Sequence, residues 1–221
     1  MNVSTNLLTG TDWQRLIAAA ADTVEAHADE LSQLDAVTGD GDHGVNVTTA
    51  LGHARNQIAH NDGAPPGAVL SATANSFLDH MGGAAGALFG SFFAGLAARI
   101  GDADTVDVQM FADAVAIGAA IVAKRGKAEP GDKTMVDALI PAVVAARQAA
   151  DRDSSIIEAL QLTAQAARKG ATATSAMTAS AGRARYAGEK SIGVQDPGAT
   201  TVALIFEAWA AACQDLRVDR Q

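Results

Sequence analysis

Apolar side chains recur along most of this chain at intervals of three and four residues, the spacing of one face of an α-helix. Near the N-terminus, Trp13, Leu16, Ile17, Ala20 and Val24 follow this spacing. Valine and isoleucine rarely alternate with polar residues, as they would in half-buried strands. The pattern therefore predicts eight helices, over about Thr11–Leu34, Val45–His60, from after Pro65-Pro66 to near Met81, from after Gly82-Gly83 to Ile100, Val106–Lys124, Lys133–Ala150, Ser155–Ser180 and Ala199–Leu216.

The residue composition agrees with an all-α fold. Alanine, the best helix former, is abundant, and aromatic residues make up only 4% of the chain. No linker, repeat or low-complexity tract separates the predicted helices, so we expect a single domain over residues 1–221. Pro141 falls inside the sixth helix, where it lacks an N–H donor and is expected to cause a kink.

The connections between the helices fall into two sets. If consecutive helices run antiparallel, as short connections favour, alternate connections lie at the same end of the bundle. The connections after the second, fourth and sixth helices are ordinary polar turns. Those after the first, third, fifth and seventh hold most of the glycines and the unusual charge patterns, and they read LDAVTGDGDHG, MGGAAGALFG, KRGKAEPGDKT and SAGRARYAGEKSIGVQDPG. One end of the bundle is therefore expected to carry a site built from four loops.

The charge of the chain excludes one large class of partner. With 25 acidic and 16 basic residues the formal charge is −9, whereas a general nucleic-acid binder needs a basic face. The sequence shows no secretory signal, and by inspection no uncharged apolar stretch approaches the roughly 20 residues of a membrane span. Cys213 is the only cysteine, so an internal disulfide is impossible. We expect a cytoplasmic protein that binds neither nucleic acid nor a membrane.

Three aspartates, Asp35, Asp40 and Asp42, surround the first of the four loops. The loop matches G-x-G-x-x-G, but the segment before it is predicted as helix, which argues against a dinucleotide-binding turn. An EF-hand is excluded because the twelfth position from Asp40 is Leu51 rather than glutamate. One cysteine and widely spaced histidines argue against zinc. The spacing leaves two readings open: a Mg²⁺ site, or a solvated turn with helix-capping aspartates.

Three predicted helices begin with residues that suit a phosphate or a nucleotide. His43 and Asn46 open the second helix, the small residues Gly82–Gly86 open the fourth, and Thr134 and Met135 lie in the first turn of the sixth. Free N–H groups at a helix N-terminus bind anions well. Each feature has an equally ordinary structural reading, as a helix cap, a tight helix contact or a Pro-Gly turn.

The last connection, Gly182–Gly198, is long enough to be a binding loop. Arg183, Arg185 and Lys190 give it the charge to meet phosphate. Its GEKS stretch is not a Walker A loop, because Glu189 separates the glycine from the lysine and no strand precedes it. No Ser-His-Asp or Cys-His nucleophile arrangement is visible in the chain.

Together these stretches resemble the nucleotide-binding L subunit of dihydroxyacetone kinase and the equivalent C-terminal domain of the ATP-dependent single-chain kinases. The resemblance covers residues 34–200, in the family's order, through LDAVTGDGDHGVN, GGAAGALFGSFF, KRGKAEPGDKTMVDALIPA and GRARYAGEKSIGVQDPGAT. It implies an all-α fold of eight antiparallel helices in a closed, up-down, barrel-like bundle. It also implies that ADP or ATP and two Mg²⁺ ions bind at one end.

The resemblance assigns roles to particular residues. By position, the residues that match the family's metal ligands are Asp35, Asp40 and Asp42. Those that match its nucleotide contacts are His43, Gly44, Val45, Asn46, Ala84, Ala85, Gly126, Thr134, Met135, Arg183, Asp196, Pro197 and Gly198. Arg183 is also the expected catalytic residue, adding positive charge during phosphoryl transfer. Two departures stand out, since relatives often have serine at the positions of Ala85 and Arg185.

The resemblance also implies partners and leaves the phosphoryl donor open. The chain is too short to include a sugar-binding domain, so it is expected to dock against a separate sugar-binding (K-type) subunit and to act as a homodimer. The leading hypothesis is a bound ADP recharged by a phosphohistidine carrier that draws on phosphoenolpyruvate. One alternative is a kinase subunit that exchanges ATP with solution and acts on dihydroxyacetone or another small ketose. A non-enzymatic alternative is a regulator that binds a transcription factor.

Overall fold

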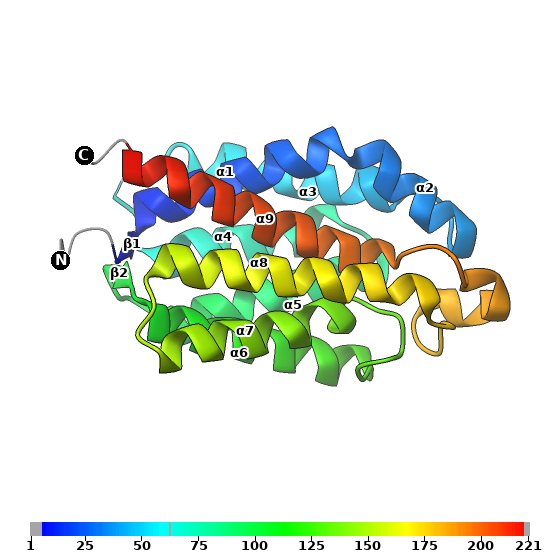
Figure 1. Ribbon diagram of the computed structural model, residues 1–221. Coiled ribbons are helices and arrows are strands. Elements are labelled where there is room, and N and C mark those ends of the chain that lie inside the picture. The colour runs from blue at the N-terminus through cyan, green and yellow to red at the C-terminus, as the bar shows by residue number, and fades with distance from the viewer. Residues whose placement is uncertain (1–5, 62, 219–221) are drawn as a thin grey trace.

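The computed structural model describes residues 6–61 and 63–218, which are mostly helical (Figure 1). Its α-helices are α1 (Gly10–Ala26), α2 (Ala28–Thr38), α3 (His43–Ile58), α4 (Pro66–His80), α5 (Gly83–Ile100), α6 (Val108–Gly126), α7 (Val136–Asp151), α8 (Ile156–Ala173) and α9 (Pro197–Val218). The other elements are the strands β1 (Leu8–Thr9) and β2 (Thr105–Val106) and the 3₁₀ segments η2 (Thr174–Ala176) and η3 (Arg183–Ser191). The all-α prediction is confirmed.

Several helices begin at side chains that cap their first turn. Thr9 and Asp12 form a capping box at the start of α1, each side chain bonding the other residue's backbone N–H. Asp107 accepts the N–H of Met110 at 2.7 Å to start α6, and Ser155 caps α8 in the same way. These caps satisfy donors that the helix itself leaves unpaired, and they set where each helix starts.

The helices pack in chain order, and the last returns to the first. From α3 onward each α-helix contacts the next, and α9 contacts both α8 and α1. In Figure 1 the start of α1, the end of α9 and the β1–β2 pair lie at one end of the bundle. The connections α2–α3, α4–α5, α6–α7 and α8–α9 lie at the other, as predicted. α1 also contacts α4, and α7 contacts α9, so some contacts cross the bundle. The closed, barrel-like arrangement stays a prediction.

The first predicted helix is in fact two helices, separated at His27. There the backbone has φ −110° and ψ 13°, and the ring Nδ1 bonds the carbonyl oxygen of Thr23 at 2.8 Å. The break brings α2 against the start of α3, where a Cβ on Gly44 would lie only 1.9 Å from the carbonyl oxygen of Ala28. The prediction of a single helix over Thr11–Leu34 was therefore wrong. The sequence gives no sign of the break, because no proline or glycine lies within that segment.

Two other helix boundaries differ from the prediction near the site end. α7 begins at Val136 rather than Lys133, because Lys133 has a φ of +59° and cannot belong to a helix. Thr134 and Met135 therefore precede α7 instead of forming its first turn. α8 ends at Ala173, and a short 3₁₀ turn replaces the predicted continuation to Ser180. α7 continues as one helix through Pro141.

α5 is the most apolar helix of the bundle. By length and composition it could span a membrane, so the expectation that no stretch approaches a span was wrong. Half of α5 is buried inside the bundle, where the helix packs between α4 and α6. Phe93 stacks on Phe77 of α4 at 5.3 Å and meets Trp209 of α9 edge-on at 6.1 Å. Core packing accounts for the hydrophobicity of this helix, because the buried core helix of a soluble protein can be as long and as apolar as a membrane span.

Candidate functional site

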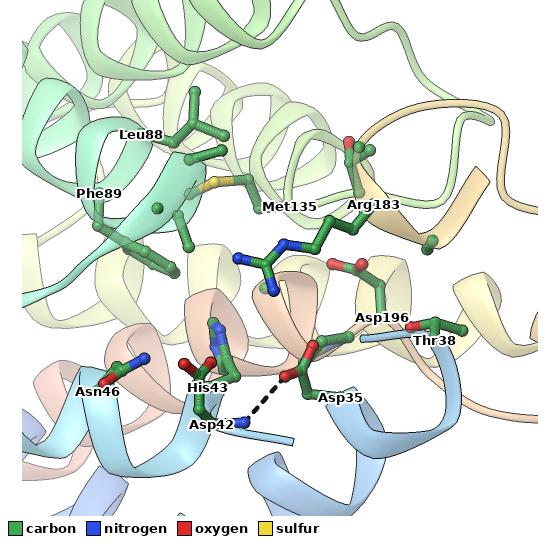
Figure 2. A pocket seen from close by; sticks show the side chains of 18 of the residues that line it. Asp35, Thr38, Asp42, His43, Asn46, Leu88, Phe89, Met135, Arg183 and Asp196 are labelled. Atoms are coloured by element: carbon green, nitrogen blue, oxygen red, sulfur yellow. Dashed lines mark hydrogen bonds between the residues drawn. The ribbon is translucent and has the colours of Figure 1, made fainter. Parts of the chain in front are cut away.

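A cavity of about 270 Å³ opens at the end of the bundle that holds the four glycine-rich connections. All four connections line it, so the prediction that they meet is confirmed. The predicted site residues that line the cavity are Asp35, Asp40, Asp42, His43, Asn46, Ala84, Ala85, Thr134, Met135, Arg183, Asp196, Pro197 and Gly198. Figure 2 shows carboxylates on one side of this cavity, apolar side chains on the other, and Arg183 reaching between them.

The three aspartates form a cluster of oxygen ligands. One carboxylate oxygen from each of Asp35, Asp40 and Asp42 lies within 4.8 Å of the others. Asp35, in the last turn of α2, also shapes the loop, since its Oδ2 accepts the N–H groups of Gly41 at 2.9 Å and Asp42 at 3.1 Å. Gly41 has a φ of +78°, which glycine adopts without strain. The loop thus folds around one carboxylate and brings the other two beside it.

Arg183 is the cation nearest to this cluster among the described contacts. Its Nη1 forms an ion pair with Asp40, and both side chains are more than half exposed. The hydrogen bond from Arg183 is the main cause that lowers the pKa of Asp40, and Asp40 in turn raises the pKa of Arg183. A Cβ added to Gly83 would lie 3.3 Å from the guanidinium Nη2. Arg183 therefore lies between the carboxylate cluster and the start of α5.

The start of α5 is built for close approach to its backbone. Gly82 is the N-cap and has no side chain, so within the described residues no N-cap side chain bonds the first N–H groups of the helix. Gly83 has a φ of +72°, and a Cβ on Gly86 would lie 1.7 Å from the carbonyl oxygen of Met81. Glycine is therefore required at these turns. N–H groups at a helix N-terminus carry partial positive charge and attract anions.

His43 faces the cavity from the first turn of α3, and its orientation is fixed from behind. Its Nε2 lies 2.8 Å from the hydroxyl of Thr201, which itself donates to the carbonyl oxygen of Pro197 at 2.9 Å. Because the hydroxyl has one proton, we assign the Nε2–H to His43, which leaves its Nδ1 as an acceptor. Burial lowers the pKa of His43, against the opposing fields of Asp35 and Asp42, so the neutral ring is favoured.

Asp196 is the N-terminal cap of α9 and a second carboxylate region of the cavity. Its Oδ2 accepts the N–H of Ala199 at 2.7 Å, and its own N–H donates to the hydroxyl of Thr174 at 2.8 Å. Burial raises the pKa of Asp196 to about 7, although the bond from Ala199 acts in the opposite direction. Asp196 is thus partly protonated near neutral pH.

An apolar wall faces the carboxylates. Met135, Leu88 and Phe89 form it, from the segment before α7 and the second turn of α5 (Figure 2). Asp137 holds the segment in place, accepting the N–H groups of Gly131 and Thr134 with its two oxygens at 2.5 and 2.8 Å. An apolar wall with a few polar groups opposite is the usual make-up of a small-molecule pocket.

Three predicted contacts do not line the cavity. Gly44 packs under it against α2, Val45 is 62% exposed, and Gly126 lies at the end of α6 beside Leu88. The cavity lining also includes residues that the sequence did not predict: Thr38, Met81, Leu88, Phe89, Lys133, Ala181 and Ala184. The position of Leu88 and Phe89, one turn after the glycine-rich start of α5, was a usable signal. The burial of Lys133 had no signal in the sequence.

Comparison with known proteins finds relatives that match most of this chain. The family model described as the DAK2 domain matches residues 37–211. The ADP-binding subunit DhaL of the PEP-dependent dihydroxyacetone kinase of Escherichia coli (strain K12) is 37% identical over 203 residues, which cover 90% of this chain and 95% of that protein. The L-erythrulose kinase of Pectobacterium atrosepticum is 39% identical over 197 residues, which cover 87% of this chain.

The chain spans about a third of the length of some relatives. It covers 33% of the L-erythrulose kinase, and 34% of the dihydroxyacetone kinase of C. freundii, whose native crystal structure aligns with a TM-score of 0.69. That alignment covers 90% of this chain at 26% identity. The similarity thus extends over nearly the whole chain, to a complete subunit in one case and to part of a longer kinase in the others.

Proposed function

Because this chain belongs to the DAK2 domain family, we propose that it is the nucleotide-binding subunit of a dihydroxyacetone kinase. The observation that carries the proposal is the cavity in which three carboxylates face an uncapped helix N-terminus and an arginine. This is the arrangement that a metal–phosphate group requires. The near-complete coverage of the E. coli ADP-binding subunit supports a separate subunit as the working form.

The carboxylate cluster fits Mg²⁺. Asp35, Asp40 and Asp42 offer only oxygen, the ligand type that Mg²⁺ prefers, within 4.8 Å of one another. We assign these residues as the ligands of two ions. When bound with the nucleotide, the metal would offset charge on the terminal phosphates. The protein's part is to hold the carboxylates together. The N–H groups of Gly41 and Asp42 both donate to Asp35, which keeps the loop folded around that carboxylate.

The two sides of the cavity suit the two ends of ADP or ATP. Ala84 and Ala85, in the first turn of α5, line the cavity, and their backbone N–H groups are the proposed phosphate contacts. Met135 offers an apolar surface for the base. His43, Asn46, Thr134, Asp196, Pro197 and Gly198 complete the proposed nucleotide contacts. Gly44, Val45 and Gly126 lie next to the contact residues rather than among them.

Arg183 is the residue proposed to act during phosphoryl transfer. It lies between the carboxylates and the start of α5, where the terminal phosphates would lie. A guanidinium stabilises charge on the transferred group without any covalent step. To meet a phosphate, Arg183 gives up its ion pair with Asp40, which frees that carboxylate for metal.

The proposal includes partner proteins. At about 270 Å³ the cavity is slightly smaller than the roughly 300–1,000 Å³ of small-molecule pockets. A nucleotide would therefore be only partly enclosed, which leaves room for another subunit to reach it. We propose a separate sugar-binding subunit that presents dihydroxyacetone, a phosphohistidine carrier that recharges ADP, a homodimeric state and a cytoplasmic location.

The L-erythrulose kinase similarity supports one competing proposal, a subunit that exchanges ATP with solution and serves another small ketose. Gel filtration of the purified protein separates the two proposals: retained ADP supports the recharged cofactor, and rapid loss of ADP supports exchange with solution.

Reconstitution with the sugar-binding and carrier subunits then tests transfer from phosphoenolpyruvate. A protein that binds Mg-ADP but supports no transfer to any ketose would favour a regulatory role. If Asp40→Asn left transfer intact, the metal assignment would be wrong.

A further inference from the structure

The segment that carries Arg183 has little regular structure of its own. Between the end of α8 and the start of α9 it forms only the short 3₁₀ segments η2 and η3, with a break at Gly188. Arg183 and Tyr186 on this segment are largely exposed. Holding such a segment in one conformation costs backbone entropy, so contacts at its base must fix it.

Lys133 provides those contacts from another loop. Its side chain is buried, with the residue only 2% exposed, and its Nζ donates to two backbone carbonyls. One belongs to Thr174, in η2, and the other to Val194, just before Asp196, at 2.6 Å. A single ammonium group thus joins the two ends of the Arg183 segment to each other and to the loop before α7.

Neighbouring bonds reinforce the same junction. The N–H of Gly193 donates to the carbonyl oxygen of Ser175 at 2.8 Å, which closes the base of the segment. Asp132, next to Lys133, accepts both the N–H and the hydroxyl of Ser180. Two consecutive residues of one loop therefore hold the Arg183 segment at its start, along its path and at its end.

Lys133 occupies a costly position. Lysine is rarely buried, and a φ of +59° is unfavourable for a residue other than glycine. Burial is the main cause that lowers the pKa of Lys133, while the carboxylates of Asp196 and Asp137 oppose this. The loop that holds this buried lysine continues directly into Thr134 and Met135, which line the cavity. The strain therefore lies where the apolar wall meets the Arg183 segment.

We propose that Lys133 is a positioning residue, which holds the Arg183 segment over the nucleotide cavity by joining both its ends to the loop before α7. This inference rests on the proposed function, because the nucleotide is what Arg183 would meet. The role is distinct from a contribution to overall stability: losing Lys133 should release the segment first.

Limited digestion with trypsin tests the release directly, without a nucleotide. Arg183 and Arg185 are cleavage sites on the segment itself. Lys133→Met is expected to speed cleavage after these residues by about tenfold, because the segment opens locally more often. Arg168→Met, which removes a part-buried cation from a pair with Glu207 between α8 and α9, is the matched control and should leave this cleavage rate unchanged. Equal rates in wild type and Lys133→Met would overturn the inference.

ADP titration in the presence of Mg²⁺ tests whether the hold acts through Arg183. Lys133→Met is expected to weaken ADP binding about tenfold in the wild-type background and less than about threefold in the Arg183→Gln background. Equal losses in both backgrounds would overturn the inference. A wild-type protein that binds no ADP would instead refute the proposed function, while the digestion result would still stand.

A second variant keeps the test decisive if Lys133→Met does not fold. Ser180→Ala removes the hydroxyl bond to Asp132 from an exposed position, so the bundle should not unfold. It is expected to raise cleavage after Arg183 by a smaller factor, about twofold to threefold, in the same direction. Protection equal to wild type in this variant would contradict the proposed hold.

Discussion

Replacing Thr201 by valine should show how much the fixed orientation of His43 contributes to the protein. Thr201 is fully buried and its hydroxyl bonds His43 Nε2 at 2.8 Å, so valine, which has the same shape, removes only that polar group. The buried Nε2–H then has no acceptor, which costs about 1–3 kcal/mol of unfolding free energy. For a chain of this size we expect Tm to fall by roughly 2–4 °C for each kcal/mol.

Thr201→Ser is the matched control, because it keeps the hydroxyl and loses one methyl group, worth about 1 kcal/mol. Thermal and denaturant unfolding give the stabilities, and ¹⁵N NMR of the histidine ring gives its tautomer. Serine should keep the Nε2–H form and near-normal ADP affinity, whereas valine should shift the tautomer and weaken ADP binding. A valine variant with wild-type stability and tautomer would refute the hydrogen-bond assignment.

Three further predictions concern charge and packing at the same end. Asp196 has a pKa of about 7 in the folded protein against an ordinary value of 3.8, so the folded state binds more protons in this range and stability falls as pH rises from 3.8 to about 7. Asp196→Asn should therefore gain stability over wild type as pH rises through 7, and a pH-independent difference in Tm would contradict this. Arg183→Gln should strengthen Mn²⁺ binding to the nucleotide-free protein, measured by electron paramagnetic resonance, while weakening Mg-ADP binding; losses in both would show that the arginine does not compete with metal. Gly86→Ala should destabilise the protein by about 1–3 kcal/mol in denaturant unfolding, because its Cβ meets the Met81 carbonyl, while Gly52→Ala in open space on α3 should not destabilise it; equal stabilities for the two would show that the backbone at α5 adjusts.

The end of the bundle that holds the site could be predicted from the sequence, because antiparallel packing sends alternate connections to the same end. The aspartates and glycines of those connections mark it by composition alone. The break at His27 and the positive φ of Lys133 could not be predicted, because neither residue type signals such a backbone. The pair of Arg183 with Asp40 joins residues 143 positions apart, so only the fold brings them together.

Different parts of the bundle rely on different interactions: apolar packing in the middle, and hydrogen bonds between polar groups around the cavity. Aromatic contacts such as Phe77–Phe93 fill the middle of the bundle and tolerate small shifts, because dispersion and burial have little directionality. Around the cavity, several buried groups are instead polar, including Lys133, Asp137 and Thr201, and their hydrogen bonds fix both distance and angle. A substitution in the aromatic core should therefore reduce stability before it changes nucleotide affinity. A substitution in the polar groups should change nucleotide affinity together with stability, because a small displacement of a carboxylate or an arginine misplaces the charge that meets the phosphates.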